Sequence, residues 1–320
     1  MLMKCVDQAS INVGTRVLVR CDLDVPVKNS RIVETFRLDS SLKTLNYISS
    51  RGGTPIIAGH LDRPGGKYSA DLSTAQLKNY FDTNLKGQYE LLENLRFDVR
   101  EEENDPAYSK ELAQKAEVYV NESFATCHRK SASIIGVTKL LPSYAGFQLV
   151  KEVESLKKIL TSPARPLLAI IGGAKIESKK PVIEKFAQIA DGVLVGGRLA
   201  LEEFMTIDKV HCPVDYVDNK DIGPKTLVGW EQMILNARTI VWAGPVGLFE
   251  DDRYSMGTRK VGEMVAAAVE LGCFALAGGG DTVTALNKFG LFGKFSFVST
   301  GGSAMLDFLV SGTLPGIEVL

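Results

Sequence analysis

The first half of the chain carries basic side chains at the ends of its apolar, strand-like runs. Arg20, His60 and Arg63 stand where strands of an open α/β sheet would end, the usual place of a ligand crevice. Guanidinium and imidazole groups at such places bind small anions through their side chains. One arginine alone more often forms a surface salt bridge, but a group of them predicts a site for a phosphorylated acid. The further basic candidates are Arg37, Arg96, His128 and Arg129.

The second half has a different pattern, in which a short apolar run stops at a glycine-rich turn. Because glycine adopts unusual backbone angles and has no side chain, several backbone N–H groups can converge there on one anion. Such turns often open a helix, whose start also favours anions. The pattern predicts a site for nucleotide phosphates. It occurs in the segments PLLAI-IGGAK, DGVLV-GGR, RTIVW-AGPVG, CFALA-GGGDT and FSFVS-TGGS.

Two lysines follow the first of these turns. Lys175 and Lys179 lie four residues apart, so on one helical face both ammonium groups would stand beside the backbone donors of the helix start. That arrangement suits a polyphosphate. Taken alone, the same spacing also fits two solvated lysines. Neither a GxxxxGK[ST] loop nor a GxGxxG fingerprint is present.

The later turns carry oxygen-bearing side chains. Asp281 and Thr282 follow three glycines, where they could bind a magnesium ion and a phosphate, or cap a helix. Residues 299–303 form either a further anion cradle or an ordinary strand-to-helix turn. Glu250 ends an apolar stretch that begins at Trp242, which suits a wall for a base with a carboxylate on the ribose, or a turn with a capping acid.

The chain has no evident pair of a nucleophile and a base. It contains neither a GxSxG elbow nor an HExxH motif, and His211 is interpreted as structural. Phosphoryl transfer between oxygens that are already anionic requires only alignment and charge neutralisation. The residues therefore favour a kinase whose acceptor is a carboxylate or a phosphate.

Composition limits the remaining possibilities. With 320 residues, of which 45% are hydrophobic, the chain is expected to form two domains. Its 37 Lys and Arg nearly balance 38 Asp and Glu, which disfavours nucleic acid and anionic lipid as partners. Five scattered cysteines, no signal-peptide pattern and no long apolar run predict a soluble protein of the cytoplasm. Small molecules are the expected partners.

Short runs rich in Val, Ile and Leu, alternating with helical patterns, predict an α/β fold with parallel sheets covered on both faces. Residues 146–160 have apolar side chains at helical spacing and end at breaker residues, which predicts a helix linking two domains. The alternative is one more surface helix of a single domain. The strands expected in the first half are RVLVR, TPIIAG, YELLENL and EVYVN, and the helices are LDSSLKTLNYISS, STAQLKNYFDTN and AYSKELAQKA.

In this order, the motifs closely resemble those of phosphoglycerate kinase over nearly the whole chain. They are VLVRCDLDVP, GHLDRP, LLENLRF, VNESFATCHR, IIGGAKIESK, IVWAGPVGLFE, GGGDT, VSTGG and LPG. The resemblance implies two doubly wound parallel-sheet domains that face each other across a cleft. It implies a phosphoglycerate-binding domain of residues 1–145 plus 311–320, an interdomain helix over 146–162 and a nucleotide-binding domain over 163–310.

The implied reaction is the reversible conversion of 1,3-bisphosphoglycerate and MgADP to 3-phosphoglycerate and MgATP, by cleft closure without a general base. A monomer is expected. The residues implied to bind the acid are Arg20, Asp22, Asp24, His60, Arg63, Arg96, His128 and Arg129. Those implied to act in the transfer are Arg37, Lys175, Gly301 and Gly302. Those implied to bind the nucleotide are Gly173, Ala174, Lys179, Gly196, Gly197, Pro245, Gly247, Leu248, Glu250, Gly280, Thr282, Ser299 and Thr300, with Asp281 as the ligand of Mg²⁺.

Some positions depart from the family pattern. Asp24 stands where the family usually has Asn, and Asp62 adds a second negative charge to the acid-binding half. Other departures are Ser131, Arg198, Ala243 and Ser303. Two alternatives follow: a kinase for another small acid, or a catalytically silent nucleotide-binding protein.

The chain is also shorter than usual for the family. One segment is missing after Pro64, and only a brief stretch separates Gly197 from the DIGP motif at residues 221–224. Because that stretch normally builds the wall beside the adenine, we expect weak discrimination between adenine and guanine nucleotides.

Overall fold

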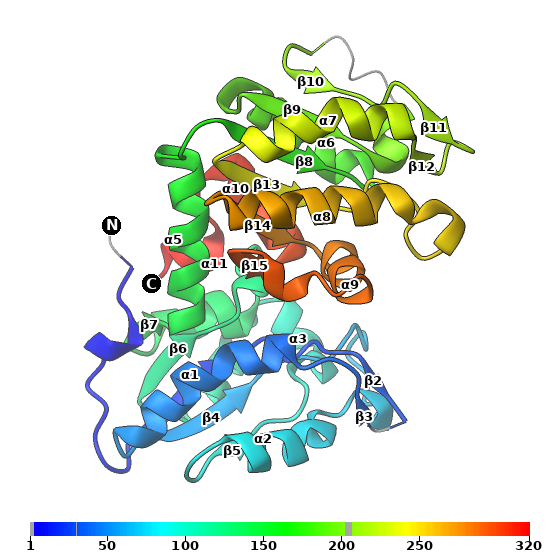
Figure 1. Cartoon of the computed structure of the whole chain (residues 1–320). Coiled ribbons are helices and arrows are strands. Elements are labelled where there is room, and N and C mark those ends of the chain that lie inside the picture. The colour runs from blue at the N-terminus through cyan, green and yellow to red at the C-terminus, as the bar shows by residue number, and fades with distance from the viewer. Residues whose placement is uncertain (1–2, 30, 202–206) are drawn as a thin grey trace. The chain divides into compact units, whose positions relative to one another are not determined.

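The chain divides into two compact units in the computed structural model, which describes residues 3–29, 31–201 and 207–320 (Figure 1). Unit 1 consists of Met1–Glu154 and Thr313–Leu320, and unit 2 consists of Ser155–Gly312. Unit 2 is therefore inserted, in sequence, between two parts of unit 1. Among the described residues, no helix has the length and apolar character required to cross a lipid bilayer.

Unit 1 is built on a five-stranded parallel sheet with the order β5-β4-β1-β6-β7. Its strands are β1 (Arg16–Arg20), β4 (Thr54–Ala58), β5 (Glu90–Leu91), β6 (Val118–Asn121) and β7 (Ser143–Ala145). Its α-helices are α1 (Phe36–Ser50), α2 (Lys78–Asn84), α3 (Val99–Glu102), α4 (Pro106–Ala113), the first part of α5 (Phe147–Thr161) and α11 (Pro315–Glu318). Its smaller elements are η1 (Val6–Gln8), β2 (Val27–Lys28), β3 (Arg31–Ile32), η2 (Ala70–Leu72), η3 (Thr74–Leu77), η4 (Leu95–Phe97), η5 (Phe124–Thr126), the π-helical turn η6 (Ala132–Gly136) and η7 (Val137–Lys139).

Both faces of this sheet are buried, which explains the continuous apolar runs of its strands. Successive side chains of a strand point to opposite faces. In β1, Val17 and Val19 pack in the same cluster as Leu38 and Leu45 of α1. Leu18 packs in a second cluster on the other face, together with Leu112 of α4 and Val137 of η7. The sequence prediction of a doubly wound sheet is confirmed.

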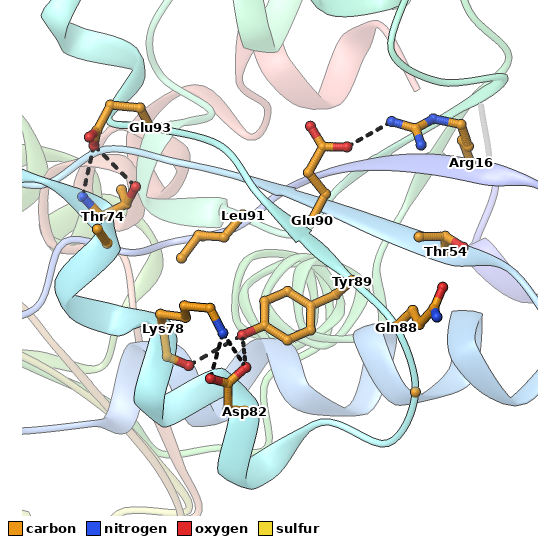
Figure 2. A pocket seen from close by; sticks show the side chains of 12 residues that line it. Arg16, Thr54, Thr74, Lys78, Asp82, Gln88, Tyr89, Glu90, Leu91 and Glu93 are labelled. Carbon is orange, nitrogen blue, oxygen red and sulfur yellow. Dashed lines mark hydrogen bonds and ion pairs between the residues drawn. The ribbon is translucent and has the colours of Figure 1, made fainter.

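The edge strand β5 is much shorter than the run YELLENL suggested. After two paired residues, the carboxylate of Glu93 accepts hydrogen bonds from Thr74 N and Asn94 N, and the chain turns into η4. A cavity of ≈ 720 Å³ lies along this edge (Figure 2). Four of its charged side chains form two ion pairs, Arg16 with Glu90 at 2.7 Å and Lys78 with Asp82, and Glu93 is hydrogen-bonded to Ser73 and Thr74. None of the residues predicted to bind substrate lines it.

Unit 2 is built on a six-stranded parallel sheet with the order β10-β9-β8-β13-β14-β15. On one face, α7 packs against α8, and on the other α6 packs against α10 (Figure 1). The strands are β8 (Leu167–Ile171), β9 (Gly192–Val195), β10 (Val210–His211), β13 (Thr239–Ala243), β14 (Phe274–Gly278) and β15 (Phe297–Ser299), with the separate antiparallel ribbon β11 (Tyr216–Val217) and β12 (Asp221–Ile222). The helices are α6 (Ile176–Ile189), η8 (Gly197–Leu201), α7 (Pro224–Asn236), η9 (Asp252–Tyr254), α8 (Met256–Glu270), α9 (Gly280–Lys288), η10 (Phe292–Lys294) and α10 (Gly302–Ser311).

The predicted linking helix corresponds to α5, whose residues fall in both units. Its start is fixed by Glu122 at the end of β6, whose carboxylate accepts hydrogen bonds from Gln148 N and Leu149 N at 3.2 Å. The hydroxyl of Thr44 donates to the same carboxylate and accepts from Phe147 N. Burial raises the pKa of Glu122 to about 8, although these donors act in the opposite direction.

Candidate functional site

In unit 1, basic side chains meet at the carboxyl ends of parallel strands. Arg20 is the last residue of β1, and His60 follows the neighbouring strand β4. Arg20 is buried, and its Nη2 lies 2.8 Å from Nδ1 of His60. Its Nε donates a hydrogen bond to Ser133 Oγ at 2.9 Å. Because both strands end at one edge of the sheet, residues 40 positions apart in sequence become hydrogen-bonded neighbours.

The imidazole of His60 is held in its neutral form. Burial lowers its pKa well below the usual value, and the nearby guanidinium groups, first that of Arg20 and then that of Arg96, lower it further. An arginine can only donate, so Nδ1 of His60 accepts from Arg20 and the ring proton belongs to Nε2. His60 therefore offers an N–H to a ligand and is unsuited to act as a cationic acid.

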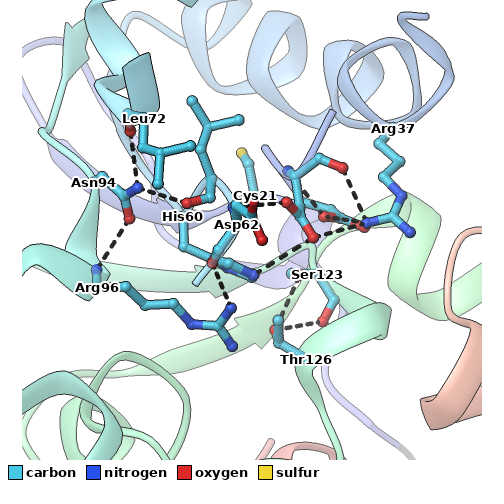
Figure 3. A network of polar contacts seen from close by, with 12 residues as sticks. Cys21, Arg37, His60, Asp62, Leu72, Asn94, Arg96, Ser123 and Thr126 are labelled. Carbon is cyan, nitrogen blue, oxygen red and sulfur yellow. Dashed lines mark hydrogen bonds and ion pairs between the residues drawn. The ribbon is translucent and has the colours of Figure 1, made fainter. Parts of the chain in front are cut away.

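Arg37 reaches the same loops from the first turn of α1 (Figure 3). Its Nη1 lies 3.4 Å from Asp22 Oδ1, 3.6 Å from Asp24 Oδ2 and 3.1 Å from the Asp24 carbonyl oxygen. Asp22 is only 2% exposed, and burial raises its pKa while Arg37 opposes that shift. Its Oδ2 is buried without a hydrogen-bond partner. The arrangement leaves an acceptor beside a guanidinium, as a hydroxylated anionic ligand would require.

A cavity of ≈ 240 Å³ opens beside Arg20 and brings together four of the predicted basic residues. Arg96 is fixed within it, since its Nη1 donates to the Asp62 carbonyl oxygen at 2.8 Å and its Nε lies 3.5 Å from Glu102. Arg63 is exposed and does not line this cavity. The predicted residues that do are Arg20, Arg96, His128 and Arg129.

The sequence reasoning missed the buried partner of this cluster. Glu101 is 2% exposed and binds Ser133, whose hydroxyl donates to Oε1 at 2.6 Å and whose N–H donates to Oε2 at 3.0 Å. Ser133 in turn accepts from Arg20. In the sequence Glu101 lies within an acidic run that resembles a solvated helix face, so only the fold reveals its position.

In unit 2, the predicted glycine turns approach one another more closely than side chains would permit. Gly173, Gly197 and Gly244 have φ values of 102°, 66° and 101°, which favour glycine. A side chain on Gly172 or Gly244 would overlap the backbone of the opposite turn. The turns after β8, β9 and β13 therefore form one surface of backbone groups, as the sequence pattern predicted.

A cavity of ≈ 380 Å³ opens beside these turns. The predicted nucleotide-binding residues that line it are Gly173, Ala174, Gly197, Pro245, Gly247, Leu248, Glu250 and Asp281. Arg198, Asn219 and Lys220 also line it and were not predicted. Asn219 has a positive φ of 52° in the turn between β11 and β12, a turn signal that could have located it at a loop tip. Gly196 is buried, and a side chain there would overlap Val246.

The two predicted lysines differ in their surroundings. Lys175 is exposed at the N-cap of α6. Lys179, one turn later, donates to the Ala243 carbonyl oxygen at 3.0 Å. Burial lowers the pKa of Lys179 to about 8, and the charge of Asp281 acts in the opposite direction. Lys179 is therefore fixed in place beside Asp281, whereas Lys175 extends from the helix start.

The last two turns lie side by side at the starts of α9 and α10. A side chain on Gly302 would come within 3.2 Å of Gly279 Cα. Gly280 begins α9 with an exposed backbone, and Gly301 N donates to the buried Ser299 Oγ at 3.2 Å, with Thr300 also buried. Thr282 Oγ1 donates to Gly278 O and accepts from Gly244 N, so in this structure its hydroxyl ties two turns together.

Asp281 is suited to a magnesium ion that is bound mainly by phosphate oxygens. It is exposed on the first turn of α9, beside Lys179. Within the described residues, no three His, Cys, Asp or Glu side chains are grouped as a metal cage. Magnesium usually takes one or two carboxylates and completes its shell with water and substrate phosphates, so a single carboxylate here fits that ion.

Comparison with known proteins gives one consistent family for the chain. The chain matches the family model "Phosphoglycerate kinase" over residues 6–212 and 202–312. It is 35% identical to the phosphoglycerate kinase of Borreliella burgdorferi (strain ZS7), over 394 aligned positions covering 100% of both chains. It is also 35% identical to that of Thermus thermophilus, over 96% of this chain and 97% of the relative. Since this chain has 320 residues, the 394 positions include deletions in it.

Two solved structures are similar over almost the whole chain. The phosphoglycerate kinase of Coxiella burnetii has a TM-score of 0.86 and 29% identity, covering 99% of this chain and 98% of that one. The phosphoglycerate kinase of Pyrococcus horikoshii has the same TM-score and 26% identity, with the same coverage. The fold expected from the sequence is thus confirmed in both parallel-sheet units.

Proposed function

The chain belongs to the phosphoglycerate kinase family and is a phosphotransferase with that activity, and from this premise we propose how its residues perform the reaction. 3-Phosphoglycerate binds in unit 1 and MgATP or MgADP in unit 2. The observation that carries this assignment is the cluster of Arg20, His60 and Arg96. Arg20 is hydrogen-bonded to His60, Arg96 is hydrogen-bonded to the Asp62 carbonyl oxygen, and both arginines line a cavity.

The domain limits follow the same assignment. The acid-binding domain comprises residues 1–145 and 311–320, a helix over 146–162 links the domains, and residues 163–310 form the nucleotide-binding domain. The protein acts as a monomer in the cytoplasm, in glycolysis. The division of the chain into two compact units supports the domain limits.

In the reaction, the carboxylate of 3-phosphoglycerate attacks the γ-phosphorus of ATP, and the bond to the β-γ bridging oxygen breaks. The attacking group is already an anion, so no side chain needs to remove a proton. Arg37 and Lys175 neutralise the charge that develops on the transferring group, and Gly301 and Gly302 donate backbone N–H groups to it. Asp281 would hold Mg²⁺, which would further neutralise the charge of the phosphate oxygens. Closure of the two domains aligns the substrates and excludes water from the acyl phosphate.

A coupled assay with 3-phosphoglycerate and MgATP tests this function. Activity should be found in the parent and should fall by about 10²-fold or more in kcat in Lys175→Ala, with a smaller change in nucleotide affinity, because the charge of Lys175 acts chiefly in the transition state. Lys180→Ala, at the next exposed lysine of α6, is the matched control and should keep the parent rate.

The outcomes separate the alternatives. Loss of nucleotide affinity with an unchanged kcat would remove Lys175 from the transfer step. A parent that binds nucleotide in calorimetry but does not phosphorylate 3-phosphoglycerate would be screened with other small acids. The carboxylate of Asp24 among the acid-binding cations is the observation that favours such an acceptor.

A further inference from the structure

Asp24 places a carboxylate directly among the cations of unit 1. Its Oδ2 lies 3.6 Å from Arg37 Nη1 and 3.9 Å from His60 Nε2. Because His60 accepts from Arg20 at Nδ1, the protonated Nε2 is the nitrogen that faces Asp24. One side chain of the protein therefore already faces two of the groups expected to bind the anionic substrate.

The same side chain also holds the loop that follows β4. Asp24 Oδ1 accepts a hydrogen bond from Asp62 N at 2.8 Å, and the carbonyl oxygen of Asp62 accepts from Arg96. Asp62 has a φ of 51°, a left-handed conformation that few residues other than glycine adopt without support. The loop, which carries Arg63, is thus fastened on both sides of Asp62 (Figure 3).

Asp24 differs from its neighbour Asp22 in its access to a ligand. The side chain of Asp22 is 2% exposed, whereas that of Asp24 is 39% exposed. Both contact Arg37, but only Asp24 can exchange this contact for one with solvent or with a bound molecule. When Arg37 is released, Oδ1 of Asp24 keeps its hydrogen bond from Asp62 N. The second oxygen of Asp22, Oδ2, has no hydrogen-bond partner.

We propose that Asp24 is a built-in counter-ion that occupies the acid-binding site of the free protein and lowers its affinity for the anionic substrate. The proposal rests on the function assigned above, since it concerns the same site. When the acid binds, Arg37 exchanges Asp24 for the substrate, while Oδ1 keeps its hydrogen bond to Asp62. The carboxylate remains close to the bound anion and repels it, so the affinity reflects a competition inside the protein.

Two substitutions at this position separate charge from positioning. Asp24→Asn keeps an oxygen for the Asp62 N–H and removes the charge. The KM for 3-phosphoglycerate should therefore fall by about fivefold, and kcat should change less than KM. Asp24→Ala removes both, so the loop loses its support and the KM should rise. A merely structural residue would raise the KM in both variants.

Asp62→Asn is the matched control, because it removes one negative charge from an exposed side chain of the same loop. Solvent screens that charge, so the change in KM should stay below about twofold. Calorimetric titration of each protein with 3-phosphoglycerate, without nucleotide, gives the affinity independently of turnover. Added salt should weaken binding more steeply in Asp24→Asn than in the parent, because its site carries more net positive charge.

The proposal is overturned if Asp24→Asn binds the acid no more tightly than the parent, if Asp62→Asn gains as much affinity, or if neither protein binds it. If the parent is an active kinase but binds the acid as tightly as Asp24→Asn does, only the counter-ion proposal is rejected and the proposed function stands. A parent that binds the acid more weakly than Asp24→Asn but transfers no phosphoryl group would reject the proposed function and support the counter-ion.

Discussion

Unit 1 and unit 2 have parallel sheets of the same type, and both carry their predicted ligand-binding residues at the carboxyl ends of the strands. In unit 1 these residues are charged and polar side chains that contact one another, as the guanidinium of Arg20 contacts the neutral imidazole of His60. In unit 2 they are mainly backbone turns, packed so closely that Gly172 and Gly244 have no room for a side chain. The same edge of a sheet can therefore be prepared for phosphate either by charge or by the absence of side chains.

The difference predicts that unit 1 is most sensitive to the loss of a charge. Arg37→Ala should lower kcat by about 10²–10³-fold, because Arg37 is proposed to neutralise the transferring group. Arg63→Ala, which removes an exposed guanidinium, should instead raise the KM for the acid with a smaller effect on kcat. Steady-state kinetics with 3-phosphoglycerate as the varied substrate measures both. A change confined to KM in Arg37→Ala would contradict the role of Arg37.

Unit 2 should be most sensitive to an added methyl group. Gly244→Ala introduces a side chain at a φ of 101° and overlaps Gly172 O, so the free energy of unfolding should fall by about 2–4 kcal/mol. Gly229→Ala is the control, because nothing lies within 4 Å of its added carbon in α7 and the helix should gain about 0.5–1 kcal/mol. Urea unfolding followed by intrinsic fluorescence tests the pair. Equal stabilities would show that the turns can move apart freely.

The units should also differ in how pH acts on them, through Glu122 of unit 1. Its folded-state pKa of about 8 lies above the ordinary 4.5, so the folded protein binds the extra proton between these values. The stabilisation is complete below pH 4.5 and is lost as the pH rises through 8. From pH 5 to 8, the free energy of unfolding should fall by at least about 1.4 kcal/mol more in the parent than in Glu122→Gln.

Thermal or urea unfolding at several pH values gives these two slopes. The variant loses an acceptor for Leu149 N, so its stability can be lower at every pH without affecting the comparison of slopes. Parallel slopes in the two proteins would place the pKa of Glu122 near its ordinary value.

The smallest expected effect concerns the base of the nucleotide. Arg198, Asn219 and Lys220 line the unit 2 cavity where the chain is short, so it offers polar side chains that can rearrange around either purine. The kcat/KM values for ADP and GDP should differ by less than about tenfold, or about 1.4 kcal/mol. A much larger preference for ADP, measured in the direction of ATP formation, would refute this prediction.

The strands of both sheets could be predicted from the sequence almost to the residue. RVLVR matches Arg16–Arg20, and the five glycine-linked runs match β8, β9, β13, β14 and β15 within two residues at either end. The reason is physical: a parallel strand buried on both faces must be apolar throughout and must end where its loop begins. The linking helix, expected over 146–160, is found at Phe147–Thr161.

Elements held by single contacts could not be predicted. β5 ends early because Glu93 and Asn94 redirect the chain, and the β11–β12 ribbon has strands of two residues each, too short to form a pattern. At the sites, residue types indicated which cations would gather, but not the pairing of Asp24 with Arg37 or the burial of Glu101. Those contacts depend on distances between segments far apart in sequence. The assigned roles of the individual site residues stay predictions.

The insertion of unit 2 within unit 1 also has a consequence for the timing of synthesis. The segment Thr313–Leu320 completes unit 1, where Gly316 N donates to Cys127 O and Leu320 packs against the sheet. A ribosome releases these residues only after all of Ser155–Gly312 has emerged. Unit 1, whose first strand is synthesised before any part of unit 2, therefore receives the segment that completes it last. Unit 2 can fold as soon as its own residues have left the ribosome.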